Sequence, residues 1–487
     1  MNAPTEIFDE EKQLRGDITN LQKKVNEFGD KQVWSDQILT KQNQLHQLIL
    51  RLKKDYPKYY NMRFNYEPAP LADIQHQVLD DQTALIEYYV GDTTIYVFTV
   101  LKNDLKAVEI PKGKDFEQRI EALRYEMTQT RPIQDATAFA KQSTQLYDAI
   151  LRGVLEKLPT TISKLIIAPD GVLSYIPFEV LMPSNNQNSA PIATSLDFRQ
   201  SDFLLKHYQI SYAYSANLLM EQKRVKRHDA AHLFAGFAPK YQNNDTLFAS
   251  VNIDRAILTR DRAYELKGAK EEVNIISKLI GGQAFANESA TESVFKKQAN
   301  QYRILHFAMH SLTDDKEPMF SKLLFTLTPQ DTTNDNDLTA GELYAMRLNA
   351  DLAVLSACNT GFGKISRGEG VMSLARAFTY AGVPATVTSL WKVPDLTTRE
   401  IMVDFYKNLK QGMTKDAALR QAKLTYLQNA PESIAANPYF WAGFVPMGNM
   451  EAIDMTKNTP LSIWGTWIGL ALVMGIVFWF CKIHYKK

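Results

Sequence analysis

Two apolar stretches of the chain end at side chains that can do covalent chemistry. One runs from residue 305 to His310, and the other runs from residue 352 to Cys358. A buried strand that stops at each of these residues brings an imidazole and a thiol to one edge of a sheet. A thiol beside an imidazole is the minimum for attack of a thiolate on a carbonyl carbon. The two residues are therefore our candidates for a base and a nucleophile.

The residues around His310 and Cys358 affect how well the pair fits a catalytic role. Small residues follow Cys358 up to Gly361, which leaves room for a substrate backbone and lets amide N–H groups point at a developing oxyanion. Spacing alone leaves a buried, unreactive thiol as the default interpretation of Cys358. His306 stands four residues before His310, a separation of ~13 Å along a strand, which is too long for one shared metal ion. We therefore expect a structural role for His306.

Other stretches do not match the motifs of cofactor or metal sites. Residues 361–368 lack the spacing of a phosphate-binding or dinucleotide-binding glycine loop. The acidic stretch 331–337 lacks the terminal glutamate of an EF-hand loop, which favours a solvated loop. Residues 367–370 are expected to start a helix, with an acidic side chain at the positive end of its dipole. The sequence predicts no cofactor and no metal ion.

Composition narrows the class of protein. At 487 residues the chain is long enough for more than one domain. Hydrophobic residues make up 45 % and charged residues 22 %, as in ordinary globular proteins, and a net charge of +1 gives no field that would recruit nucleic acid. The two cysteines are Cys358 and Cys481, so a fold built on disulfides is excluded.

The C-terminal region carries a membrane signal. Residues 461–480 form an uncharged stretch, long enough to cross ~30 Å of hydrocarbon as a helix, with Trp464, Trp467 and Trp479 toward its ends. The sequence predicts one transmembrane helix. The lysines of the tail favour a cytoplasmic tail, whereas the absence of a secretory signal after Met1 favours the opposite orientation. The side on which the globular part lies stays open.

The pattern along the chain predicts three kinds of region. Residues 10–56 have the apolar spacing of two antiparallel helices that break near Gly29. Residues 84–90 and 93–100 predict a β-hairpin, residues 114–158 predict helix, and residues 183–202 predict a long surface loop.

From about residue 208, strand and helix patterns alternate. The predicted strands are 232–237, 303–308, 322–327, 351–357, 385–390 and 440–445, and the predicted helices are 269–280, 291–300, 338–344, 369–382, 397–410 and 415–427. This alternation predicts a mostly parallel sheet with helices on both faces. Ligands of such sheets bind at the carboxyl ends of strands, where His310 and Cys358 fall.

These motifs together resemble the CHAT domain, a family of caspase-related cysteine peptidases, over residues 80–449. The similar stretches are 306–310 and 355–361 for the histidine and cysteine motifs, 368–382 for a helix, 389–395 and 441–444 for the last core strands, and 166–171 and 176–181 for the earlier half. The 48 residues that separate His310 from Cys358 are also close to the spacing in caspases. The order and number of the motifs make the resemblance specific.

The resemblance implies a caspase-like α/β fold and particular roles at its site. It implies that His310 is the base and Cys358 the nucleophile, with the backbone N–H groups of Ser311 and Cys358 as oxyanion donors. The family often has glycine where this chain has Ser311, whose side chain narrows the site. A substrate pocket is expected near Glu369, Trp391 and Asp395, with the two carboxylates suited to a basic residue; no third catalytic residue is identifiable.

The expected domain organisation follows from these features. A helical, coiled-coil-like hairpin (1–66) precedes the N-terminal half of the CHAT region (67–230, a pseudo-caspase-like subdomain) and the catalytic caspase-like subdomain (231–450). The transmembrane helix (461–481) and a short basic tail (482–487) follow.

The expected function is that of a membrane-anchored CHAT-type cysteine endopeptidase. The resemblance implies a regulated signalling or defence protease, which we expect at a bacterial inner membrane. Its expected partners are a protein or peptide substrate, the lipid bilayer through residues 461–480, and a regulatory partner at the N-terminal helices, with no nucleic acid. The alternative is a catalytically silent membrane scaffold that uses the fold for protein interaction.

Overall fold

The computed structural model describes the chain in segments. These are residues 5–29, 32–55, 68–128, 136–183, 197–224, 230–241, 266, 268–314, 318–328, 331, 334–356, 364–366, 370–372 and 374–455. Cys358, Glu369 and the predicted membrane span at 461–480 lie outside these segments. Within them, no helix combines the length and the apolar character needed to span a membrane.

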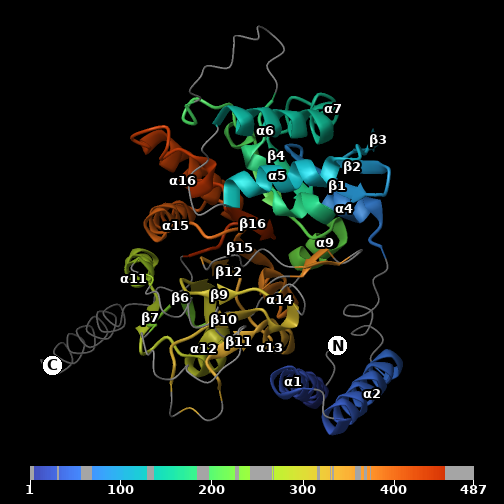
Figure 1. Cartoon of the computed structure of the whole chain (residues 1–487), viewed down its shortest axis with the longest axis vertical. Helices are drawn as coiled ribbons and strands as arrows, with labels where there is room; N and C mark the ends of the chain where they lie inside the picture. Colours follow the sequence, from blue (N-terminus) through green and yellow to red (C-terminus); the bar gives the residue numbers. More distant parts are fainter. Residues whose placement is uncertain are drawn as a thin grey trace, which may run out of the picture.

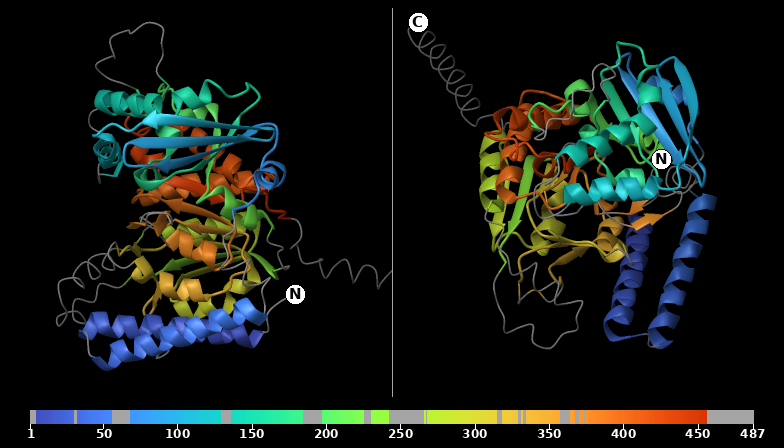
Figure 2. Two further views of the ribbon diagram at one scale, coloured as in Figure 1. Left: turned by 90° about the vertical axis from the view of Figure 1, so that its right-hand side faces the viewer. Right: turned by 45° about the horizontal axis from the view of Figure 1, so that its top comes forward.

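Two long helices form an N-terminal hairpin. Helices α1 (Thr5–Phe28) and α2 (Gln32–Asp55) pack against each other, as the sequence predicts, and Gly29 between them has a φ of 80°. Glycine adopts this left-handed conformation without the steric cost that other residues meet. Figure 2 shows the hairpin lying against the part of the protein that contains α13 (Ala340–Ala345), which α1 contacts.

An 11-stranded sheet runs through the rest of the described chain (Figure 1). In spatial order its strands are β3 (Asp104–Pro111), β2 (Thr94–Leu101), β1 (Thr83–Val90), β4 (Lys164–Ala168), β5 (Gln209–Tyr212), β16 (Phe444–Gly448), β15 (Ala385–Ser389), β12 (Leu352–Leu355), β8 (Tyr302–Phe307), β6 (His232–Pro239) and β7 (Gln283–Asn287). Within this sheet, antiparallel pairing between the described strands is limited to β1–β2, β2–β3 and β15–β16. The prediction of a mostly parallel sheet flanked by helices is confirmed.

Helices cover the sheet. They are α4 (Leu71–Gln77), α5 (Phe116–Thr128), α6 (Ala136–Ile150), α7 (Arg152–Leu155), α8 (Leu204–His207), α9 (Ala216–Arg224), α11 (Ala269–Ile280), α12 (Glu292–Gln298), α14 (Leu374–Tyr380), α15 (Asp395–Lys410), α16 (Lys415–Asn429) and α17 (Pro438–Trp441), with 3₁₀ turns η1 (Gly171–Tyr175), η2 (Phe178–Val180), η3 (Ala299–Gln301) and η4 (Pro318–Phe320).

The central strands are buried on both faces. Along β12, Leu352 and Val354 face a core that includes residues of α15 and α16, whereas Ala353 and Leu355 face a second core that includes residues of α12, α13 and α14. Successive strand side chains point to opposite faces, so a strand between two helical layers must be apolar throughout. This requirement explains the continuous apolar run that marks β12 in the sequence.

Several predicted elements differ from the structure. The strand predicted at 322–327 is short (β10, Lys322–Leu324) and belongs to a separate three-stranded sheet with β9 (Ser311–Leu312) and β11 (Asp337–Thr339). The predicted helix 338–344 begins later, because Thr339 and Glu342 form a capping box at the start of α13. The strand predicted at 440–445 begins only at Phe444, because Asn437 caps the short helix α17 just before it.

The helix predicted at 369–382 is also shorter than expected. It begins at Leu374, and the residues before it include β14 (Gly370–Met372), which pairs with β13 (Lys364–Ser366) in a two-stranded sheet. The expectation that residues 367–370 lead directly into a helix is therefore wrong. Strands β3, β5 and β7 were not predicted, because each is short or lies at an edge of the sheet with a weak apolar pattern.

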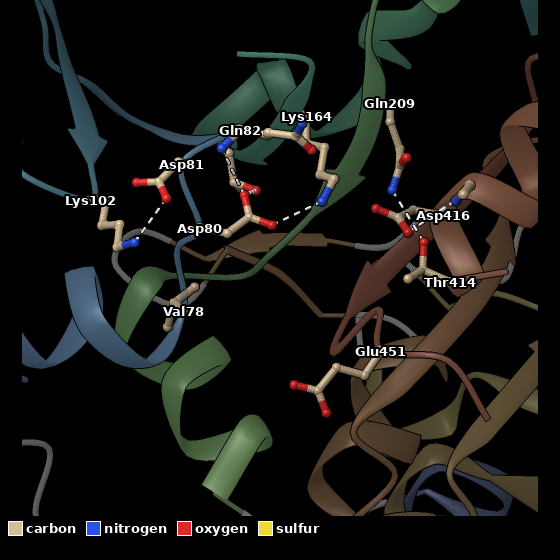
Figure 3. A network of polar contacts seen from close by, with 12 residues as sticks. Val78, Asp80, Asp81, Gln82, Lys102, Lys164, Gln209, Thr414, Asp416 and Glu451 are labelled. Atoms are coloured by element: carbon tan, nitrogen blue, oxygen red, sulfur yellow. Dashed lines mark hydrogen bonds and ion pairs between the residues drawn. The ribbon is translucent and has the colours of Figure 1, made fainter. Parts of the chain in front are cut away.

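A polar network joins the amino ends of β1 and β4 (Figure 3). Asp80 accepts hydrogen bonds from Lys164 Nζ at 2.9 Å and from the Gln82 backbone N–H at 3.0 Å. Nearby, Gln209 at the start of β5 donates to Thr414, the residue that precedes α16. The contact between Gln209 and Thr414 joins the first half of the sheet to the helical layer contributed by the C-terminal half.

Candidate functional site

The two motif residues follow neighbouring parallel strands. In the register of β8 and β12, Phe307 pairs with Leu355, and His306 pairs with Val354. His310 and Cys358 each come three residues after the paired ends Phe307 and Leu355. Cys358 itself lies outside the described residues, and the described chain leaving β12 extends to Ser356.

His310 is buried, and its backbone is held from two sides. The His310 N–H donates to the Tyr241 hydroxyl at 2.9 Å, and the Leu324 N–H donates to the His310 carbonyl at 3.0 Å. The Tyr241 hydroxyl in turn donates to the Leu324 carbonyl at 2.8 Å. The rings of Tyr241 and His310 are 4.6 Å apart between centroids. These contacts fix the chain where it leaves β8 and enters β9.

A pocket opens at the carboxyl ends of the central strands. Its lining comes from the residues that directly follow β8 and β12, from β15 and β16, and from helices α11 and α15; it includes Glu272, Met309, Ser356, Ser389, Asp395 and Phe444. This is the edge of a parallel sheet at which ligands bind. Two of its lining residues precede the candidate pair in the chain: Met309 comes directly before His310, and Ser356 comes two residues before Cys358.

Asp395 is the predicted pocket residue that lines this pocket. It is the first residue of α15, and it packs closely on Gly268, where a Cβ would lie 3.1 Å from the Asp395 carbonyl oxygen. Burial raises the pKa of Asp395, and the nearby Lys392 and His310 oppose that rise. A buried carboxylate of this kind favours a cation beside it.

The other residues predicted for the site are not among those that line the pocket in the described chain. Ser311 begins β9 and pairs with Leu323 of β10. Trp391 is buried in the core, where its indole N–H donates to the Tyr439 carbonyl at 2.9 Å. It is not among the residues that line the pocket in the described chain. Glu369, like Cys358, lies outside the described residues.

A buried polar cluster beneath the pocket was not predicted. Glu272 Oε1 lies 2.8 Å from His306 Nε2 and accepts a hydrogen bond from Ser356 Oγ at 2.9 Å. His306 is fully buried, and its other ring nitrogen lies 3.1 Å from the Tyr406 hydroxyl. His306 therefore sits in a structural network, as expected from its position within a strand.

One signal in the sequence could have revealed Glu272. The buried face of α11 consists of Ala269, Glu272, Val273 and Ile276, which follow the spacing of one helical stripe. An acidic residue inside an apolar stripe requires a buried polar partner. The sequence does not say where that partner lies.

Comparison with known proteins places the chain among its relatives. Residues 140–449 match the CHAT domain family. Tetratricopeptide repeat protein 28 of Mus musculus is 25% identical over 338 residues, which cover 62% of this chain and 12% of that protein. Its counterpart in Homo sapiens is 24% identical over 436 residues, 78% of this chain and 16% of that protein. The chain thus spans only a small part of the length of these curated relatives.

Solved structures also show similarity. The separase–securin complex of Saccharomyces cerevisiae matches with a TM-score of 0.47 and 9% identity, covering 78% of this chain and 30% of that chain. The complex of Porphyromonas gingivalis RgpB pro- and mature domains matches with a TM-score of 0.35 and 9% identity, covering 70% of this chain and 78% of that chain. Because the family match covers well over half of the sequence, this protein belongs to the CHAT domain family.

Proposed function

We propose that this protein is a cysteine endopeptidase in which His310 is the base and Cys358 the nucleophile. The observation that carries the proposal is the register of β8 and β12. Adjacent parallel strands, paired at Phe307 and Leu355, are each followed after three residues by one member of the pair. A small pocket opens at the same edge and is lined by Asp395.

The proposed reaction has two steps. The Cys358 thiol transfers its proton to His310, and the thiolate attacks the scissile carbonyl carbon to form a C–S bond. The backbone N–H groups of Ser311 and Cys358 stabilise the negative oxygen of the intermediate. Collapse breaks the C–N bond, and His310 returns the proton to the leaving amine. Water then hydrolyses the thioester, which releases the acid and restores the thiol.

The pocket supports a preference for a basic side chain next to the scissile bond. Asp395 lines it, and burial disfavours an isolated negative charge there. A lysine or arginine side chain of the substrate would offset that cost with a charge-assisted hydrogen bond. Glu369 is proposed as a second carboxylate for this specificity on its charge alone.

The N-terminal hairpin is proposed as the docking element for a regulatory partner. Helix α1 contacts α13, which follows directly on β11. In the small sheet β11 pairs with β10, and β10 pairs with β9, which begins at the residue after His310. A partner bound to the hairpin therefore has a contiguous route to the backbone beside the proposed base.

The bilayer is proposed as a further partner. This part of the proposal rests on the uncharged stretch 461–480 and its flanking tryptophans in the sequence. An anchor of this kind would confine cleavage to substrates near a membrane surface.

The test of the endopeptidase is cleavage of a peptide library derived from a proteome. The full chain is compared with Cys358→Ala, and new termini are identified by mass spectrometry. Cleavage by the wild type and by a Cys481→Ser control, but not by Cys358→Ala, is the expected result. Equal cleavage patterns with and without Cys358 would refute the proposal. Enrichment of lysine or arginine before the cleaved bond is expected from the pocket.

The second candidate is a silent scaffold that uses the fold for protein interaction. The observation that favours it is the name of the curated relatives, which are described as repeat proteins. Alkylation of Cys358 across a pH range separates the two candidates. An activated thiol reacts well below the value near ~8.5 at which free cysteine ionises, whereas a scaffold shows the ordinary profile.

A further inference from the structure

Glu272 is a charged residue in an otherwise apolar setting. It is 2% exposed and shares the buried face of α11 with Ala269, Val273 and Ile276. A buried carboxylate is costly unless hydrogen bonds satisfy it. A leucine at this position would fill the same stripe of the helix without that cost. The position of its partners shows what the carboxylate does.

One oxygen of Glu272 joins two strands. Its Oε1 lies 2.8 Å from His306 Nε2 on β8 and accepts from Ser356 Oγ, just past β12, at 2.9 Å. The Tyr406 hydroxyl lies 3.1 Å from the other nitrogen of His306. Burial and the nearby Glu272 raise the pKa of Tyr406 well above its usual value, so this hydroxyl stays protonated and can donate. With its Nδ1 accepting from Tyr406, His306 donates its Nε2–H to Glu272.

Both partners of Glu272 lie just before the proposed catalytic residues in the chain. His306 comes four residues before His310, and Ser356 comes two residues before Cys358. The described ladder between β8 and β12 ends at the pair Phe307 and Leu355. Glu272 adds a link from the helical layer between His306, within that ladder, and Ser356, just past its end. It also faces the pocket that it lines together with Ser356 and Asp395.

We propose that Glu272 is a positioning residue that holds the ends of β8 and β12 at a fixed separation, so that the base and the nucleophile meet. This inference rests on the proposed function. Glu272 acts through His306 and Ser356 and touches no reacting atom. A displacement of about 1 Å between reacting groups is enough to slow a reaction about 100-fold. The network therefore has a large effect on rate without taking part in the chemistry.

The experiment measures Cys358 reactivity and turnover in a Cys481→Ser background, so that only one thiol is labelled. The variants are Glu272→Ala, Glu272→Gln and Ser356→Ala. Glu271→Gln is the matched control, because Glu271 is the neighbouring residue on α11 but is exposed and pairs with Arg399. Iodoacetamide labelling is followed from pH 5 to 10 (about the range in which thiols titrate), and thermal unfolding is measured in parallel.

A positioning role for Glu272 predicts that the variants differ in the size of their effect on kcat and on the labelling of Cys358. Glu272→Ala lowers kcat for a peptide from the library about 100-fold and moves the labelling profile of Cys358 toward that of free cysteine. Ser356→Ala, which removes one of the two hydrogen bonds, lowers kcat about tenfold by the same logic. Glu272→Gln keeps an acceptor oxygen in place, so it retains most of the kcat that Glu272→Ala loses. Glu271→Gln behaves as the background protein does.

Three outcomes are decisive. In the first, Cys358 is activated in the background protein, and folded Glu272→Ala and Ser356→Ala have the same labelling profile and kcat as that protein. This result overturns the positioning role and leaves the endopeptidase proposal intact. An ordinary thiol profile in the background protein overturns the endopeptidase and the positioning role with it. If Glu272→Ala fails to fold, Ser356→Ala decides alone, and an unchanged kcat in that variant refutes the inference.

Discussion

Lys423 Nζ lies 3.1 Å from Glu179 Oε1, and both side chains are almost completely buried. Lys423 belongs to α16 and Glu179 to η2, so this ion pair joins two segments 244 residues apart in the chain. The other oxygen of Glu179 accepts a hydrogen bond from the Tyr212 hydroxyl on β5. The first half of the sheet is thereby connected to α16, a helix from the C-terminal part of the chain.

Removal of one partner of this pair is expected to destabilise the protein strongly. Lys423→Met leaves a buried carboxylate without its cation, so the free energy of unfolding should fall by about 3 kcal/mol. The double variant Lys423→Met/Glu179→Leu should recover much of that loss, because no uncompensated charge remains. Urea unfolding followed by circular dichroism measures both. The exposed pair Lys102–Asp81 provides the control, and Lys102→Met should change stability by less than about 1 kcal/mol. Equal losses in the single and double variants would contradict this account.

The Tyr241 hydroxyl is expected to matter for both stability and rate. Tyr241→Phe keeps the ring beside His310 but leaves the buried His310 N–H and Leu324 carbonyl without this partner, which should cost about 2 kcal/mol. Because the same bond holds the backbone at the proposed base, kcat should fall about tenfold or more. Thermal unfolding and peptide turnover test the two effects. Tyr125→Phe, at an exposed position, is the control; a Tyr241→Phe protein with normal turnover would argue against a role for this contact in aligning His310.

The raised pKa of Asp395 predicts that substrate specificity depends on pH. Its pKa is raised from 3.8 by burial, so it loses its charge at a higher pH than an ordinary aspartate does. The preference for a basic over an uncharged residue should therefore weaken already in mildly acidic solution. Asp395→Asn should reduce that preference about tenfold at neutral pH and make it independent of pH. Competition between matched arginine and norleucine peptides measures the ratio, and a wild-type ratio that is flat across mildly acidic pH would contradict the assignment.

The same pKa has a consequence for stability. The folded-state pKa lies above that of the unfolded chain, so the contribution of Asp395 is most favourable below the unfolded pKa and declines as the pH rises through the folded pKa. At neutral pH the charged side chain therefore opposes folding slightly. Asp395→Asn should raise the melting temperature at neutral pH, and the gain should disappear at low pH.

The proposed membrane anchor gives a prediction that does not involve catalysis. The full chain should float with lipid vesicles and resist extraction at high pH, because residues 461–480 are apolar and uncharged. The double variant Leu470→Arg/Val473→Arg should release the protein, since each arginine near the centre of a spanning helix costs about 3 kcal/mol. Leu327→Arg, on the exposed surface of the globular part, should not. Extraction of the wild-type chain at high pH would refute the anchor.

The sequence alone determined the features that depend on local pattern. The N-terminal helices are amphipathic along their length, and the central strands are continuous apolar runs, so both were identified within a few residues. The positions of His310 and Cys358 after two such runs followed in the same way. A strand buried on both faces tolerates few polar residues, so the first polar residues after an apolar run indicate where the strand ends.

Only the tertiary structure decided which distant residues meet at that edge. Glu272 reaches Ser356 across 84 residues, and Tyr241 reaches His310 across 69, and no periodicity in the chain records either contact. The structure also places β10 in the small sheet with β9 and β11, and it has the hairpin of β13 and β14 where the sequence predicts the start of a helix. The physical reason is that the local pattern of apolar and polar residues indicates which side chains are buried. The packing of helices and strands decides which residues each buried side chain contacts.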